Sequence, residues 1–232
     1  MLASPDHLDL WRIYLNPQNV TVEDCLSALS EDEQKRGFGF VFLQNRTHYF
    51  IARFSMRMIL SYYLDTKPSK IEFAYNEYGK PFLKNREIEF NLSHCNEQAI
   101  LAVTHQSLLG IDIEYMNHEL DLQPIAQEIL SEREYQEFSS LDYPFQTRAF
   151  YRAWTCKEAF TKCLGYGLFF DVRCCQVNLN PFEKVDLLSI DCPGLNSQDY
   201  HIYDIRTNIS DYIAVTVNKG GRKQLRYFDF SF

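Results

Sequence analysis

The sequence lacks the cysteine arrangements that hold small secreted domains or zinc sites together. It contains seven cysteines, an odd number, and no two of them are spaced as Cys-x-x-Cys. Disulfide frameworks use paired cysteines, and tetrahedral zinc sites use closely spaced ones. The pattern therefore indicates neither kind of site. Cys156 and Cys163 fall in a helical stretch and are expected to be small core residues.

The sequence also shows no pattern of a membrane segment or of a signal peptide. No apolar run approaches the roughly 20 residues that a transmembrane helix needs. Residues 1–7 show neither the basic start nor the apolar stretch of a signal peptide. We therefore expect a cytoplasmic location and no membrane partner.

Positive charge is scarce. Lys and Arg number 23 against 31 Asp and Glu, which gives a net charge of −8. Nucleic-acid binding in general requires a basic surface, so a nucleic-acid partner is not expected. A small anionic ligand needs only a local cluster of cations. The sequence has no Walker A loop and no Gly-x-Gly-x-x-Gly motif, so side chains would have to hold a nucleotide.

What the sequence does contain is ample apolar material and a mixture of helix and strand patterns. Hydrophobic residues make up 46% of the chain, enough for one large domain or two small ones. Helices are predicted at residues 47–64, 131–138 and 143–164, and strands at 8–15, 71–75, 88–92, 99–104, 109–114, 174–179, 201–205 and 212–217. Residues 93–97 are expected to join two strands as a hairpin loop. The class is therefore α+β.

A faint repeat runs through the chain. In both halves a long helix with basic residues precedes strands, and the strand pattern of residues 99–104 returns at 212–217. We expect two similar α+β subdomains related by a pseudo-two-fold axis, covering residues 1–107 and 108–232. Two fused halves make a monomer sufficient.

Two carboxylates alternate with isoleucines in the predicted strand 109–114. Alternation places Asp112 and Glu114 on one face and the isoleucines on the other. Alone, this pair also fits a solvated edge strand. Helical spacing places Trp154, Glu158 and Lys162 on one stripe of the second long helix, among residues that look inward. A third acid there would be costly to bury without partners. Three carboxylates suit a hard cation, and magnesium bound to a substrate diphosphate is the prediction.

Candidate anion-binding residues lie in the first half. Ser93 and His94 follow a strand, where a hydroxyl, an imidazole and backbone N–H groups can bind an anion. Lys80 lies on a Gly-Lys-Pro turn. Arg36 ends a short helix, and Arg53 lies on the long one. Each also has a structural interpretation; for Arg36 it is that of a cation at a helix C-terminus.

These motifs resemble the 4′-phosphopantetheinyl transferase superfamily, of the surfactin-synthetase-activating type. Four blocks carry the resemblance, in matching order and spacing: residues 78–81, 90–94, 110–114 and 150–162. It extends over residues 30–217. The resemblance implies transfer of the phosphopantetheine arm of coenzyme A to a serine of an apo acyl or peptidyl carrier protein, with release of adenosine 3′,5′-bisphosphate. It also implies coenzyme A in a cleft between the two halves.

The resemblance assigns roles to individual residues. Asp112, Glu114 and Glu158 match magnesium ligands, although some family members lack an acid at the position of Glu114. Lys162 matches a lysine near the diphosphate, and Asp112 also faces the substrate there. Coenzyme A contacts are implied for a further set of residues, namely Arg36, Arg53, Lys80, Ser93 and His94.

Several alternatives stay open. The general base is Glu158, Glu134 or water, and Glu134 also fits a capping box with Ser131. A magnesium-dependent hydrolase of coenzyme A would use the same carboxylates, and a binding module would retain the ligand without turnover. Carrier proteins are acidic, so docking needs local patches. The candidates for docking are Arg148, Arg152, Lys157 and the apolar residues at 166–170.

Overall fold

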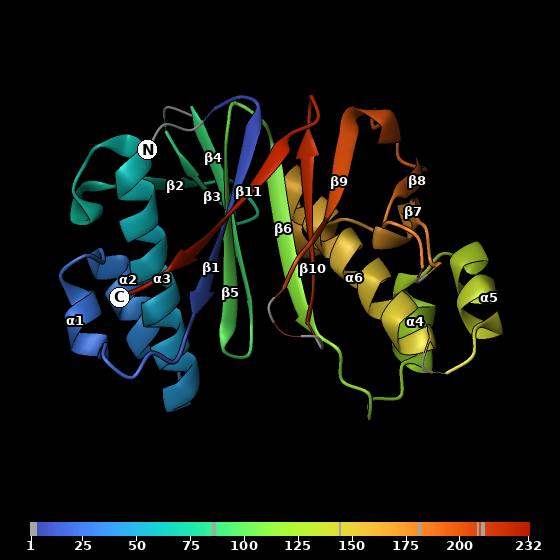
Figure 1. The fold of residues 1–232 in the computed structure, drawn as a ribbon, viewed down its shortest axis with the longest axis horizontal. Helices are drawn as coiled ribbons and strands as arrows, with labels where there is room; N and C mark the ends of the chain where they lie inside the picture. The colour runs from blue at the N-terminus through green and yellow to red at the C-terminus, as the bar shows by residue number, and fades with distance from the viewer. Residues whose placement is uncertain (1–3, 85–86, 144, 181, 208, 210–211) are drawn as a thin grey trace. The chain divides into compact units, whose positions relative to one another are not determined.

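The computed structural model describes residues 4–84, 87–143, 145–180, 182–207, 209 and 212–232. Its contacts divide the chain into two compact units (Figure 1). Unit 1 comprises residues 1–74, 81–106 and 223–232, and unit 2 comprises residues 75–80 and 107–222. Two parts of the sequence predictions lie outside the described residues. They are residues 1–3, within the stretch considered for a signal peptide, and Pro144, in the predicted helix 143–164. No helix in the described ranges has the length and apolarity to span a bilayer.

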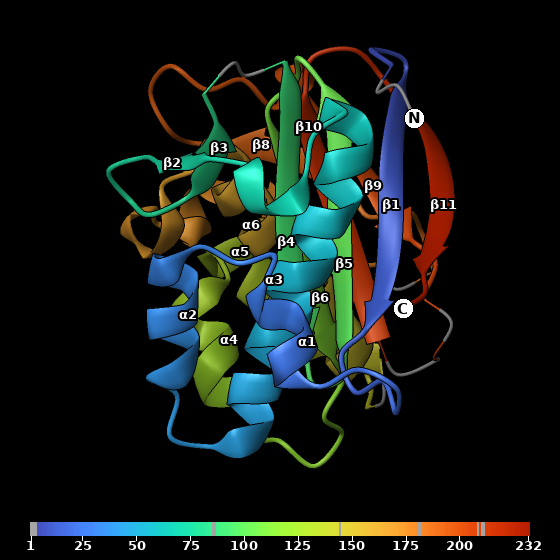
Figure 2. The same cartoon turned by 90° about the vertical axis from the view of Figure 1, so that its left-hand side faces the viewer.

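Unit 1 is a four-stranded sheet with helices packed on it. Its elements are β1 (His7–Tyr14), α1 (Val22–Leu26), α2 (Glu31–Phe38), α3 (Leu43–Leu64), β2 (Phe73–Tyr75), β3 (Pro81–Leu83), β4 (Ile88–Cys95), β5 (Gln98–His105) and β11 (Gln224–Phe230). The strand order is β11-β1-β5-β4, and β2 pairs with β3 separately. The buried face of α3 supplies Phe50, Ile51, Met56, Ile59 and Leu60 to a core shared with the sheet. Helices α1 and α2 pack against α3 (Figure 2).

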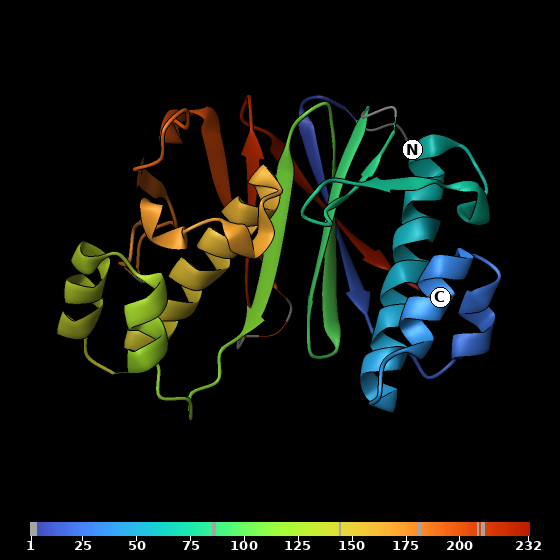
Figure 3. The ribbon, with the colours of Figure 1, turned by 180° about the vertical axis from the view of Figure 1, so that it is seen from behind.

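Unit 2 is built around one long helix and a three-stranded sheet. Its elements are β6 (Leu109–Tyr115), α4 (Gln123–Ile129), α5 (Glu132–Ser140), α6 (Phe145–Leu164), β7 (Cys175–Val177), β8 (Leu187–Ile190), β9 (Tyr200–Ile205) and β10 (Tyr212–Lys219). The strand order is β6-β10-β9, with β7 and β8 paired separately. Helix α6 contacts both β6 and β10 and supplies Phe150, Cys156 and Phe160, among others, to the core of the unit (Figure 3).

The two sheets share a three-strand motif with the same order and the same register. In unit 1, β5 lies between β1 and β4, and in unit 2, β10 lies between β6 and β9. Val103 of β5 pairs with Asp9 of β1, and Val215 of β10 pairs with Asp112 of β6. The segments around the two acids read Leu-Asp-Leu and Ile-Asp-Ile. The repeat that the sequence indicated is therefore present in the strand topology, and Asp9 is the counterpart of Asp112.

The end of the chain departs from the predicted division at residue 107. Strand β11 pairs in parallel with β1, from His7 opposite Gln224 to Ile13 opposite Phe230. Residues 223–232 therefore belong to unit 1, because their backbone hydrogen bonds are made there. Residues 75–80 belong to unit 2, where the Asn76 side chain donates to the Gly165 carbonyl at 2.8 Å.

Candidate active site

The candidate site in unit 2 depends on a close approach between β6 and α6. Gly110 lies where a Cβ atom would be 2.0 Å from the carbonyl oxygen of Ala159 and 2.4 Å from the backbone nitrogen of Cys163. Any larger residue would force the helix away from the strand. The glycine thus lets the second half of α6 lie directly on β6, just before the two acids of the strand.

Asp112 is the most deeply buried acid of this site, with 3% of its surface exposed. It forms an ion pair with Lys162 of α6, in which Nζ donates to Oδ1 at 2.5 Å. The Lys162 side chain is 29% exposed, whereas the Asp112 side chain is 4% exposed. The pair therefore joins a buried acid on the strand to a cation that reaches solvent on the helix.

Glu114 lies two residues further along the same face of β6. The indole Nε1 of Trp154 donates to its Oε1 at 3.0 Å. Burial raises the pKa of Glu114, and the neighbouring charge of Asp112 raises it further. The Trp154 hydrogen bond and Lys162 act in the opposite direction, and Glu158 adds a smaller upward contribution. These influences mean that the three acids are close enough to affect one another.

Glu158 completes the set from α6. Burial raises the pKa of Glu158, Lys162 lowers it and Asp112 raises it. Trp154, Glu158 and Lys162 are half-buried, whereas the residues between them on α6 are mostly buried. The predicted stripe is therefore formed, and it faces the acids of β6. The sequence assigned Trp154 no role of its own; its place on this stripe was the available signal for its bond to Glu114.

The donor set fits a hard divalent cation in its chemistry. Three carboxylates gathered in a half-buried site repel one another, and two of them have raised pKa values for that reason among others. In the described ranges, no three His, Cys, Asp or Glu side chains are arranged as a ready metal cluster. Lys162 neutralises Asp112 instead. Cation binding therefore requires side-chain adjustment at Asp112.

Lys80 lies in unit 2 and bridges its two site-forming elements. Its Nζ donates to the carbonyl of Leu109, at the start of β6, at 2.8 Å, and contacts the carbonyl of Cys163, near the end of α6, at 3.4 Å. Its backbone N–H donates to the side chain of Asn76. Lys80, the lysine of the Gly-Lys-Pro turn, thus links β6 to α6 beside Gly110.

Ser93 and His94 lie on a strand: the predicted hairpin is present, but its turn is confined to Asn96 and Glu97 instead of extending over residues 93–97. Strand β4 continues to Cys95, with Ser93 opposite Ile100 and His94 opposite Ala99 in β5. Backbone pairing with β5 extends the strand past the point where the apolar pattern stops. Successive side chains alternate between faces: Ser93 is buried and His94 is exposed.

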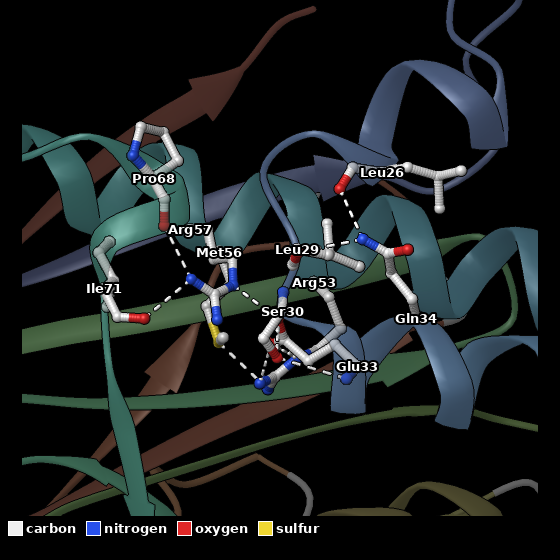
Figure 4. Close-up of polar contacts among 10 residues, drawn as sticks. All are labelled: Leu26, Leu29, Ser30, Glu33, Gln34, Arg53, Met56, Arg57, Pro68 and Ile71. Carbon is white, nitrogen blue, oxygen red and sulfur yellow. Dashed lines mark hydrogen bonds and ion pairs between the residues drawn. The ribbon is translucent and has the colours of Figure 1, made fainter.

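The two arginines predicted to contact coenzyme A differ in their surroundings. Arg36 is exposed in the last turn of α2. Arg53 is 12% exposed and ion-paired with Glu33, with a 2.8 Å bond from Nε to Oε1. Arg57 donates to the other oxygen of Glu33 at 2.7 Å and to the carbonyls of Pro68 and Ile71 (Figure 4). Arg53 and Arg57 therefore share the single carboxylate of Glu33 within unit 1.

Glu134 is held by three donors and is 2% exposed. The backbone N–H of Ser131 and Nζ of Lys157 donate to its Oε2 at 2.7 and 2.8 Å, and the backbone N–H of Val177 donates to its Oε1 at 2.8 Å. The capping box with Ser131 is present. This arrangement favours a structural role for Glu134 over that of a catalytic base.

Two of the predicted docking residues on α6 were wrongly placed at the surface. Lys157 has no side-chain exposure and also donates to the carbonyls of Val172 and Cys175. Arg152 is 4% exposed and donates to the carbonyls of Asn180 and Glu183. Helical spacing from the buried Ala153 and Phe160 was the available signal for Lys157. Arg148, by contrast, is exposed.

Asp9 in unit 1 has different hydrogen-bond partners from its counterpart Asp112 in unit 2. Arg226 of β11 donates to both oxygens of Asp9 at 2.6 and 2.7 Å, and the hydroxyl of Tyr63 donates to it at 2.6 Å. Asp9 is 2% exposed. An arginine from the last strand thus neutralises the acid of unit 1, whereas the acid of unit 2 meets a half-exposed lysine.

Comparison with known proteins agrees with the resemblance read from the sequence. The pattern of the 4′-phosphopantetheinyl transferase superfamily matches residues 108–217, and one described as 4′-phosphopantetheinyl transferase, N-terminal, matches residues 14–106. The chain is similar to 4′-phosphopantetheinyl transferase HetI of Nostoc sp. (strain PCC 7120), with 37% identity over 186 residues and 78% of each chain covered. It is 30% identical over 179 residues to 4′-phosphopantetheinyl transferase Sfp of Bacillus subtilis (strain 168), covering 77% of each.

The chain belongs to the 4′-phosphopantetheinyl transferase superfamily. It is accordingly an enzyme of the transferase class. The superfamily pattern of residues 108–217 contains Asp112, Glu114, Glu158 and Lys162, the cluster that β6 and α6 assemble. The clustered carboxylates and lysine therefore lie in the part of the chain that the superfamily shares.

Proposed function

We propose that this chain transfers the 4′-phosphopantetheine arm of coenzyme A to a serine of an apo carrier protein and releases adenosine 3′,5′-bisphosphate. The observation that carries the proposal is the cluster of Asp112, Glu114, Glu158 and Lys162 in a member of this superfamily. Acids that repel one another beside an exposed cation suit the binding of a cation together with a diphosphate.

Asp112, Glu114 and Glu158 would hold magnesium through their carboxylate oxygens. A magnesium ion bound there supplies charge neutralisation at the diphosphate oxygens. Asp112 provides the buried anchor, and Trp154 fixes the orientation of Glu114 through its 3.0 Å hydrogen bond. Lys162 must leave Asp112, at least in part, when the ion is bound. Its exposed ammonium group is then available to the substrate diphosphate.

The chemical step balances without a covalent enzyme intermediate. The serine oxygen of the carrier attacks the phosphorus that bears the pantetheine arm, and the bond from this phosphorus to the bridging oxygen breaks. Adenosine 3′,5′-bisphosphate leaves with the electron pair, and Lys162 stabilises its developing charge. Glu158 accepts the serine proton, directly or through water. Positioning and electrostatics account for the rate enhancement.

The residues proposed to bind the rest of coenzyme A are Arg36, Lys80, Ser93 and His94. Arg36 has an exposed guanidinium group suited to a phosphate. Arg53 is proposed to act through Glu33 and helix α2, because its own charge is already paired. In unit 2, Tyr166 and Phe169 are 42% and 82% exposed and contact the Tyr78 ring. They remain proposed carrier contacts.

Incubation with coenzyme A, magnesium and a panel of apo carrier proteins tests the proposal. Mass spectrometry should detect the phosphopantetheine adduct on at least one carrier, and chelation of magnesium should abolish it. A hydrolase acting through the same carboxylates would instead release phosphopantetheine into solution with every carrier unmodified. A binding module would retain coenzyme A unchanged.

A further inference from the structure

One surface of unit 1 is apolar and exposed to an unusual degree. Val41, Phe42 and Leu43, between α2 and the first turn of α3, are 87%, 71% and 70% exposed, and Phe38 nearby is 50% exposed. Three consecutive large apolar residues on a surface are uncommon unless they serve binding. We call Phe38, Val41, Phe42 and Leu43 the α2–α3 patch.

The segment that carries the α2–α3 patch is basic beyond the first turn of α2, where Glu31 and Asp32 are exposed. Residues 34–64 contain no Asp or Glu, although the chain as a whole has a net charge of −8. Lys35 and Arg36 are exposed in the last turn of α2, and Arg46 lies in the first turns of α3. Helix α3 has no side-chain cap at its N-terminus and no acid in its first turn. Its dipole therefore adds to the positive potential.

The patch is rigidly supported. Glu33 accepts hydrogen bonds from Arg53 and Arg57 of α3 and, through its capping box, from Ser30 at the start of α2 (Figure 4). At Gly37 a Cβ atom would lie 2.4 Å from the ring of Phe50, so α2 touches α3 at a second point.

The segment between the two helices is tied down as well. Nη2 of Arg46 donates to the carbonyl of Phe40 at 3.0 Å, and its guanidinium group lies 6.0 Å from the ring centre of Phe38. The exposed apolar side chains are thus presented by a fixed backbone, which lowers the entropy cost of binding a partner.

We propose that the α2–α3 patch is a docking surface for the acidic apo carrier protein, an inference that rests on the proposed function. The reaction requires a protein partner, and two acidic proteins need a local positive surface in order to meet. Lys35 and Arg46 supply the positive rim. Val41, Phe42 and Leu43 supply apolar contacts, which suit a protein surface and not the charged phosphates of coenzyme A.

The test removes the apolar side chains without weakening α3. Serine is a preferred residue at a helix N-cap, the position of Phe42, so Phe42→Ser is compatible with folding. In the full chain, the triple variant Val41→Ser, Phe42→Ser, Leu43→Ala is compared with Tyr62→Ser. Tyr62 is 51% exposed near the other end of α3. Thermal unfolding is measured for every variant.

We expect the triple variant to raise KM for the apo carrier about tenfold, the effect of losing one hot-spot contact. Its kcat and its KM for coenzyme A should stay at the wild-type values, and Tyr62→Ser should change none of the three. An unchanged KM for the carrier overturns the proposal. A rise in KM for coenzyme A alone also overturns it. The same holds if the triple variant loses self-association or binding to anionic vesicles while its KM for the carrier is unchanged. Absence of transfer by the wild-type chain would contradict the proposed function itself.

A charge variant tests the same surface independently. Lys35→Glu reverses a charge of the rim while leaving the apolar residues and Arg36 in place. We expect a higher KM for the carrier at low salt and a weaker dependence of that KM on ionic strength. The same salt dependence as in the wild type would contradict the charge argument.

Discussion

Asp112 and Lys162 are the pair on which the candidate site depends. A carboxylate with 4% side-chain exposure would be costly to bury alone, and its ion pair with a half-exposed ammonium group offsets that cost. Under the proposed function, Lys162 would move toward an incoming anion while a cation replaces it at Asp112. The carboxylate of Glu114 is held differently, by a hydrogen bond from the Trp154 indole.

At the residue scale we expect a graded loss of activity among the three acids. Asp112→Asn should lower kcat at least about 100-fold, because it removes a charge at the diphosphate without changing the side-chain volume. Glu158→Gln should do the same, and Glu114→Gln should cost less. Steady-state transfer of the arm to a carrier is the measurement, with Glu119→Gln, exposed on the same unit, as the control. Wild-type turnover by Asp112→Asn would remove this residue from the site.

The buried pair of Glu134 and Lys157 leads to a different expectation, a loss of stability. Glu134→Gln leaves the Lys157 ammonium group buried with only carbonyl oxygens as acceptors, which should cost about 3 kcal/mol of unfolding free energy. Urea unfolding measures this, and Glu132→Gln on the exposed side of α5 should cost little.

Below its unfolding temperature, Glu134→Gln should keep a kcat close to that of the wild type. A 100-fold loss of kcat with unchanged stability would restore Glu134 as a candidate base.

At the scale of elements, short helices α2 and α5 are fixed by the same device. Each begins with a serine whose capping-box glutamate, Glu33 or Glu134, is buried and ion-paired with the following long helix. The cations on the long helices, Arg57 and Lys157, also donate to carbonyls beyond the ends of these helices. One buried acid thus joins three segments in each unit.

The Glu33 cluster should make stability depend on pH. Burial alone would raise the pKa of Glu33, but Arg53, the Ser30 N–H and Arg57 together hold it below its ordinary value. A lowered folded pKa contributes stability that is complete above the ordinary value, about 4.3, and is lost as pH falls through the lowered one.

The difference in unfolding free energy between wild type and Glu33→Gln should therefore shrink on acidification below that value. Urea unfolding at neutral and acidic pH measures it. Glu31→Gln, exposed in the same turn, should show no such change. A difference between wild type and Glu33→Gln that stays constant with pH would contradict the account of the cluster.

The element scale also explains what the sequence could and could not predict. The Asp112 and Glu114 alternation and the stripe of Glu158 and Lys162 follow from periods of 2 and 3.6, so the candidate site was accessible from sequence. Strand β4 extends beyond its apolar pattern because β5 pairs with it, and no local signal predicts Ser93 on a strand. The burial of Lys157 depends on carbonyls 15 and 18 residues away.

For the whole molecule, the two units are variations on one strand arrangement, and the candidate carboxylate site lies in unit 2. Asp9 and Asp112 occupy equivalent places in their sheets. Arg226 of the last strand, β11, forms a bidentate ion pair with Asp9. The second acid is paired instead with Lys162, whose side chain is 29% exposed. The distant pairing of β11 with β1 was missed because parallel partners far apart in sequence leave no local pattern.

The most direct test of the central claim is the stoichiometry of the reaction. With magnesium, coenzyme A and an apo carrier, we expect one adenosine 3′,5′-bisphosphate released for each carrier that gains the phosphopantetheine arm. The adduct should lie on a single serine, and a carrier with that serine replaced by alanine should gain nothing. Cleavage of coenzyme A with no mass gain on any carrier, or no cleavage at all, would contradict the account.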